Sequence, residues 1–374
     1  MSKLSANIID RILPDYFNNT QLEEFNKVIS KTLPPHSIIK LSDNLTIKEQ
    51  LDLDLLLSND YSQYIDLLIT FTLKNLEFSK SVEFLLLLGD NSITQGELTT
   101  ASRIYNHTLS IVNHNSNLEN ISAYCHLSLG EISSREANWN EAISYIKTAQ
   151  KLFNKHKDLK GSAKCSNLLG TIYGDRGNLR KAKINFENSL SLLEPKTDTS
   201  LIGMLEVNLG IIYNIQGNYD EALSYYQRAL IKYEQLRDQK RISEIKHNLG
   251  MLYLQKGEYD KAIIEFDSSI RIALEIGNLP TLSLSYLNKA YIYSQINDFD
   301  LSAAFAEKSM EICFSLNDRL SIADLYKIKG IIEQHKKNYL ISENYFLTSI
   351  RINEELENIM NAEKEKLKTM NLAN

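Results

Sequence analysis

Proline and cysteine are scarce in this sequence, and long apolar runs are missing. Five prolines occur among 374 residues, so long stretches of chain are free to form helices. Cys125, Cys165 and Cys313 show no C-x-x-C spacing, and we expect them to be buried, reduced side chains. No apolar run is long enough to cross a bilayer, and the N-terminus lacks a secretory signal. These absences predict a cytoplasmic protein that does not associate with a membrane.

Charge and motifs exclude further classes of function. Lys and Arg number 41 against 47 Asp and Glu, a net charge of −6, which disfavours a nucleic-acid surface. The sequence has no phosphate-binding loop, dinucleotide fingerprint, H-E-x-x-H pair or nucleophile elbow. The seven histidines are scattered without metal-like spacing. We therefore predict no catalytic activity, no cofactor and no metal site.

A repeat of 40 residues organises most of the chain. The clearest copy runs from Asn208 to Leu230, and the copy beginning at Asn248 is nearly superimposable on it. A period of this length is typical of stacked helical pairs. The first small residue falls at Gly130, Gly170, Gly210, Gly250, Ala290 and Gly330 in six copies, and an earlier, seventh copy has Gly89, 41 residues before Gly130.

Each conserved slot of the repeat has a physical explanation. Apolar spacings of three, four and seven predict two amphipathic helices per copy. The first glycine allows the two helices to approach closely. A second glycine, as at Gly217 and Gly257, ends the first helix in a left-handed conformation, which Asn297 also tolerates. We therefore predict at least fourteen helices between residues 82 and 355, and no strand.

The order of small, aromatic and glycine residues resembles the tetratricopeptide repeat family over about residues 82–355. The period of 40 residues is longer than is usual in this family, and it is similar to that of kinesin light chain and of bacterial peptide-sensing regulators. The resemblance implies an all-α, right-handed superhelical solenoid of about seven to eight helix pairs with helical caps. It also implies that the first helix of each pair lines the concave side.

Three parts are expected along the chain: an N-terminal helical cap at 1–81, which could include a degenerate helix pair, the repeat array at 82–355, and an extension of the last helix, as a C-terminal cap, at 356–374. The cap would contain a short helix around residues 21–31 and an apolar helix from about Tyr61 to Leu76. Thr46 and Glu49 have the spacing of a capping box ahead of a further helix.

Asparagines occupy one inward slot in three consecutive repeats. A carboxamide can both donate to and accept from a peptide backbone, so such a ladder suits an extended peptide. The alternative is that an Asn-rich composition placed them there by chance. A carboxylate clamp is disfavoured because Met204, Glu244 and Leu284 stand where basic residues would be needed. The predicted peptide-binding residues are Asn208, Asn248, Asn288, Asn214, Lys164, His247, Gln255, Tyr291 and Gln295.

The resemblance leaves more than one function open. The first hypothesis is a scaffold or adaptor that binds a protein or peptide partner on its concave face. The second is a Rap-type regulator, in which an N-terminal bundle precedes seven repeats and a small peptide controls action on a response regulator, in some cases as a phosphatase. A DNA-binding regulator would need a helix-turn-helix that residues 1–40 lack. The partner's identity and a homodimer stay open.

Overall fold

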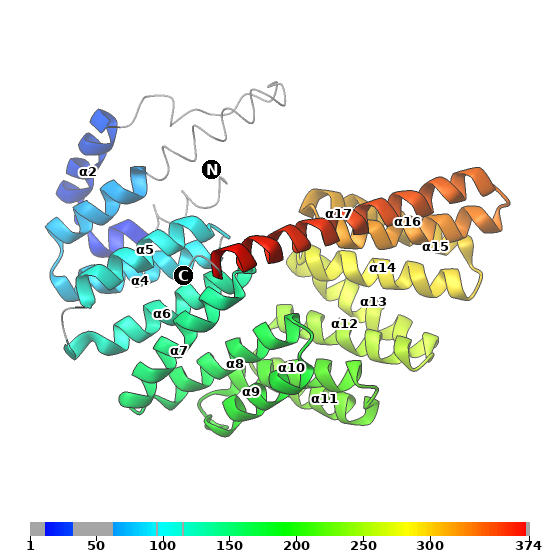
Figure 1. The fold of residues 1–374 in the computed structure, drawn as a ribbon, viewed down its shortest axis with the longest axis horizontal. Helices are drawn as coiled ribbons and strands as arrows, with labels where there is room; N and C mark the ends of the chain where they lie inside the picture. The colour runs from blue at the N-terminus through cyan, green and yellow to red at the C-terminus, as the bar shows by residue number, and fades with distance from the viewer. Residues whose placement is uncertain (1–11, 33–62, 95, 114–115, 372–374) are drawn as a thin grey trace. The chain divides into compact units, whose positions relative to one another are not determined.

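The computed structural model describes residues 12–32, 63–94, 96–113 and 116–371. By its internal contacts the chain forms two compact units, Met1–Leu193 and Glu194–Asn374. No strand occurs within the described ranges, and within each unit the helices follow one another in chain order (Figure 1). The prediction of an all-α solenoid with at least fourteen helices is therefore confirmed. The predicted three-part division of the chain stays a prediction.

The first unit begins with a helical cap and continues into repeat pairs. The short helix expected near residues 21–31 is present, and residues 63–75 of the expected apolar helix are helical. The capping-box residues Thr46 and Glu49 lie outside the described residues. In chain order the elements are α2 (Asn19–Thr32), α4 (Phe78–Thr94), α5 (Leu98–Val112), η2 (Ser116–Leu118), α6 (Glu119–Arg135), α7 (Trp139–Lys155), α8 (Leu159–Asp175) and α9 (Leu179–Ser191).

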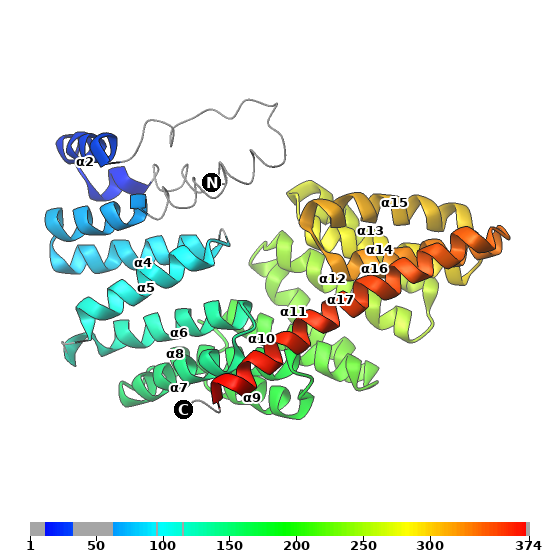
Figure 2. The same cartoon turned by 45° about the horizontal axis from the view of Figure 1, so that its top comes forward.

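The second unit consists of four helix pairs (Figure 2). The last helix is continuous through residues 354–370, as the sequence predicts. Its helices are α10 (Thr199–Ile215), α11 (Tyr219–Gln235), α12 (Gln239–Gln255), α13 (Tyr259–Ile276), α14 (Leu279–Gln295), α15 (Phe299–Leu316), α16 (Arg319–His335) and α17 (Tyr339–Asn371).

Two glycine slots set the geometry of each pair. A Cβ added at Gly210 would lie 2.6 Å from the ring of Tyr226, so only glycine leaves room for that ring. Gly217 has φ of 77° and Asn297 has φ of 64°, which confirms the left-handed turn between the two helices. Asp238 begins the next pair by accepting a hydrogen bond from the Arg241 backbone N–H. The sequence therefore specifies both the crossing and the turn.

Buried apolar side chains fill the space between neighbouring pairs. In the second unit, one such cluster joins Ala222, Tyr226 and Tyr233 of α11 to Ile245 and Leu249 of α12. Cys125, Cys165 and Cys313 are all buried and free, as expected. Burial raises the pKa of the Cys125 and Cys165 thiols to about 12, so these thiols stay protonated at neutral pH. None of the described helices is both long and apolar enough to span a bilayer.

Candidate functional site

Contacts between helices identify the inner layer of the second unit. Successive first helices touch one another, as α10 does with α12, α12 with α14, and α14 with α16. No comparable contact joins the described helices α11 and α13, or α13 and α15. In a curved stack, the more closely spaced layer lies on the concave side. We call the solvent-exposed side of α10, α12, α14 and α16 the inner face.

The inner face is a regular array of side chains. On each first helix, four positions spaced by four, three and four residues lie on one side of the helix. The first two rows are Met204, Glu244, Leu284 and Asp324, followed by Asn208, Asn248, Asn288 and Ile328. The next two are Ile211, Met251, Tyr291 and Ile331, followed by Ile215, Gln255, Gln295 and His335. Three of the four helices thus contribute the asparagine row, which ends at the buried Ile328 of α16.

The asparagines lie at equivalent places, but they are not fully open to solvent. Asn208, Asn248 and Asn288 are each partly buried. The Asn288 amide donates to the Leu284 carbonyl one turn earlier, at 2.9 Å. Asn208 also has an interaction within the protein. The predicted ladder requires amides that are free to bind a ligand, and Asn288 does not meet this requirement, because its amide must first leave its own helix.

The other predicted residues are not equally accessible. Gln255 and Gln295 are exposed, and Tyr291 is 38% exposed. The prediction that Asn214 binds a peptide is not supported, because this residue is only 7% exposed. Its Oδ1 has no hydrogen-bond partner among the described residues. Asn214 lies one residue, or about 100° around α10, from Ile215, so it belongs to none of the four rows of the inner face. Lys164 is exposed on α8 of the first unit, so the structure groups the other eight residues in the second unit.

His247 is held between neighbouring helices rather than extended from the surface. Its Nδ1 lies 3.0 Å from the Ser285 hydroxyl, and its ring packs 5.5 Å from that of Phe266. Desolvation lowers the pKa of His247 to about 4. At neutral pH the imidazole is therefore uncharged, and it presents no cation to a ligand.

Apolar side chains on the inner face were missed as site residues. Ile211, Leu284 and Ile215 are 36%, 36% and 57% exposed, on helices whose other apolar residues are mostly buried. Exposed apolar side chains grouped with polar ones indicate an interaction surface. The signal was present in the sequence, since these residues share the phase of the asparagines.

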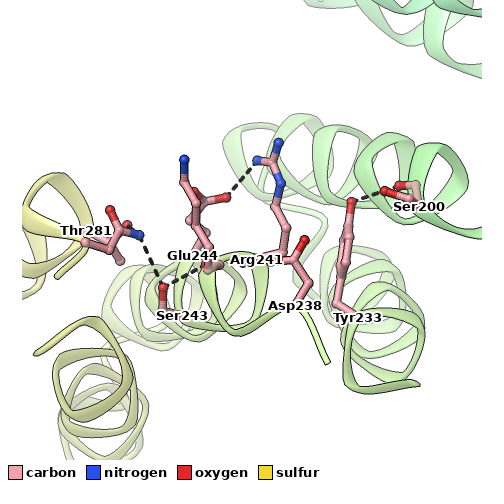
Figure 3. A network of polar contacts seen from close by, with 9 residues as sticks. Ser200, Tyr233, Asp238, Arg241, Ser243, Glu244 and Thr281 are labelled. Carbon is pink, nitrogen blue, oxygen red and sulfur yellow. Dashed lines mark hydrogen bonds and ion pairs between the residues drawn. The ribbon is translucent and has the colours of Figure 1, made fainter. Parts of the chain in front are cut away.

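Polar contacts fix the first turn of α12, which carries Glu244 of the inner face (Figure 3). Arg241 Nη1 lies 2.8 Å from Glu244 Oε2, and the Arg241 backbone N–H donates to the Asp238 carboxylate. The Tyr233 hydroxyl donates to the Ser200 carbonyl at the start of α10. The first two contacts fix the start of α12, and the third ties α11 to the start of α10, so each helix start is held by its own polar contacts.

A buried carboxylate supports the same face from behind. Glu206 on α10 is 3% exposed, and its carboxylate lies 2.9 Å from both Arg228 Nη2 and Lys232 Nζ of α11. Both cations therefore compensate the buried charge. No cluster of three or more His, Cys, Asp or Glu suited to a metal occurs in the part of the chain that the structure describes. The inner face offers amide, carboxylate and apolar groups, which suit a peptide segment.

A family model of the tetratricopeptide repeat matches residues 201–274 and 241–313. No curated protein matches the sequence. Among solved structures, aspartyl phosphate phosphatase F from Bacillus subtilis is 17% identical, with 93% of this chain and 87% of that chain covered and a TM-score of 0.59.

Two further solved structures were determined with a bound partner. The Rap conjugation gene regulator of plasmid pLS20, in complex with the Phr* peptide, is 16% identical, with 95% of this chain and 90% of that chain covered and a TM-score of 0.59. A Rap protein complexed with competence and sporulation factor is 17% identical, with 91% and 98% covered and the same TM-score. At such identities the likeness concerns the fold. Residues 201–313 therefore match the tetratricopeptide repeat family, and the chain has an all-α fold similar to that of these Rap proteins.

Proposed function

We propose that the inner face of α10, α12, α14 and α16 binds an extended peptide or protein segment, and that the chain acts as an interaction scaffold. The observation that carries the proposal is the pairing of two adjacent rows. The asparagine row lies beside the row of Ile211, Met251, Tyr291 and Ile331. A peptide needs partners for its backbone and contacts for its side chains, and these two rows supply one of each.

Spacing supports an extended ligand. Packed helices lie about 10 Å apart, whereas an extended chain advances about 3.3 Å per residue. Successive asparagines would therefore meet the ligand backbone at about every third residue. Side chains between those points would rest on Ile211 and Tyr291, so the face favours segments with apolar residues at intervals. Two of the structures with this fold were determined with a peptide or factor bound, which is consistent with such a ligand.

The test uses peptides selected from a random display library on the full chain. Their affinity is then measured for wild type and for the triple variant Asn208→Ala, Asn248→Ala, Asn288→Ala. We expect at least about tenfold weaker binding, which corresponds to about 1.4 kcal/mol. The matched control is Gln227→Ala with Gln235→Ala, two exposed amides on α11 of the outer layer. Equal affinity of the triple variant and wild type would place the binding surface elsewhere.

A second candidate is a Rap-type modulator of a response regulator. The similarity of fold favours this second candidate, because the two structural alignments cover 91–95% of this chain and so include the first unit. One solved relative is named an aspartyl phosphate phosphatase, but no residue of this chain is assigned a catalytic role. The discriminating measurement is the lifetime of a phosphorylated response regulator from the same cell with and without this chain. An unchanged lifetime, together with complex formation, would favour a scaffold without phosphatase activity.

A further inference from the structure

The last helix departs from its counterparts at positions that face solvent. In α11, α13 and α15 the equivalents of Leu340 are Asp220, Asp260 and Asp300, all exposed. The equivalents of Leu347 are Gln227, Asp267 and Glu307, also exposed. In α17 both positions are leucines, which are 73% and 55% exposed. Two charged or polar positions one heptad apart have therefore become apolar at the end of the array.

A third apolar residue extends this surface. Ile350 is 51% exposed, whereas its equivalents Ile270 and Met310 are 8% and 7% exposed because the next repeat covers them. No repeat follows α17 within the described residues. Leu340, Leu347 and Ile350 lie on one side of the helix because they are spaced by seven and three residues. We call this surface the terminal face; a contiguous apolar surface of this kind marks an interaction site.

The charges beside the terminal face are arranged symmetrically. Glu343 and Arg351 are exposed and lie four residues before and four residues after Leu347. If two copies of α17 pack antiparallel about a two-fold axis at Leu347, each Glu343 reaches the same level as Arg351 of the other copy. The two leucines then meet at the axis. A surface that complements itself in this way is the requirement for an isologous dimer.

We propose that the terminal face binds a second copy of this chain, with the two α17 helices antiparallel and Leu347 at the two-fold axis. The proposal does not depend on the ligand of the inner face. Parallel packing would place Glu343 beside Glu343 and Arg351 beside Arg351, and like charges would oppose it. The interface is small and centred on a few apolar side chains, so dimerisation is reversible and depends on concentration.

The main test is sedimentation velocity of the full chain over a wide concentration range. Wild type is expected to pass from monomer to dimer as concentration rises. The variant Leu340→Asp with Leu347→Glu copies Asp300 and Glu307 of α15, residues that this helix position already tolerates. We expect it to keep its circular-dichroism spectrum and to weaken the dimer at least about tenfold. The control is Ile264→Ser, which removes an apolar side chain 62% exposed on α13 and copies Ser224 of α11.

Charge reversal tests the orientation. Glu343→Arg and Arg351→Glu should each weaken the dimer, since each places like charges together. A mixture of the two single variants should associate again, because both contacts across the antiparallel axis become Arg with Glu. The proposal is overturned if wild type stays monomeric at all concentrations, or if the leucine variant dimerises like wild type. It is equally overturned if the mixed variants fail to associate. In those cases the terminal face has another occupant or another geometry.

Discussion

The two neighbouring repeats α10–α11 and α12–α13 have nearly the same sequence pattern, yet they fill equivalent space differently. Both place a glycine under an aromatic ring: Gly210 faces Tyr226, and Gly250 faces Phe266, with an added Cβ 2.6 Å from the ring in each case. Both end the first helix with a left-handed glycine, at Gly217 and Gly257. The features shared by the two repeats are those that control how the helices cross and turn.

The differences lie at the other end of the pair. In α10–α11, Gly203 leaves room for the ring of Tyr233. Their equivalents forty residues later are Ser243 and Ala273, which are both small side chains. Val207 and Ala229 are likewise replaced by His247 and Ser269, which join Ser285 in a buried hydrogen-bonded chain. The comparison teaches that a repeat tolerates changes of size and polarity at positions where both partners change together.

The largest effect is expected where the two repeats agree. Gly210→Leu or Gly250→Leu should destabilise the protein by about 1–3 kcal/mol or more, because the new side chain collides with a buried ring. Chemical denaturation at constant temperature measures this change. Gly174→Ala is the control, since its Cβ would have only an ordinary contact at 3.9 Å. That variant should gain roughly 0.5–1 kcal/mol from its helical position. Unchanged stability of the leucine variants would mean that the glycine slots are not close crossings.

The next prediction concerns pH and the polar chain that joins His247 and Ser269 to Ser285, which has no counterpart at Val207 and Ala229 of α10–α11. His247 has a folded pKa of about 4, against about 6.5 in an unfolded chain. Between these values the unfolded state binds a proton that the folded state does not. The contribution of the neutral imidazole is therefore complete above about pH 6.5 and is lost as pH falls through about 4. The loss is at most about 3 kcal/mol.

The matched variant for this prediction is His247→Val, which copies Val207 of the neighbouring repeat. We expect wild type to lose stability relative to this variant between pH 6.5 and 4, as measured by denaturation at several pH values. The readout is the difference in pH dependence, which a general packing defect would not produce. Parallel stability curves for the two proteins would show that His247 titrates normally.

Much of the fold was predictable from sequence because periodicity constrains it strongly. Gly210, Gly217 and their equivalents occur in register, and each has one dominant physical role. The candidate site was less predictable, since phase gives the direction of a side chain but not its depth. Asn214 was predicted to lie on the inner face, yet it is offset by about 100° from Ile215 and is buried. Asn288 has the right position, but its amide bonds to its own helix. Depth and local partners depend on the neighbouring helix, which a single repeat does not encode.

The smallest effect is expected when the stability changes caused by substituting two tyrosines of α11 are compared. The Tyr233 hydroxyl donates to the Ser200 carbonyl at 2.8 Å, so Tyr233→Phe should cost about 1 kcal/mol, the usual net value of such a bond. Tyr226→Phe removes the same atom from the same helix, but the equivalent residue of α13 is Phe266. Because that repeat packs its glycine against a phenylalanine ring, Tyr226→Phe should change the free energy of unfolding by less than about 0.5 kcal/mol. Thermal and chemical denaturation of the two variants side by side measure this difference. If both variants lose the same stability, the hydroxyl of Tyr226 matters as much as that of Tyr233, and the two repeats differ more than their shared pattern indicates.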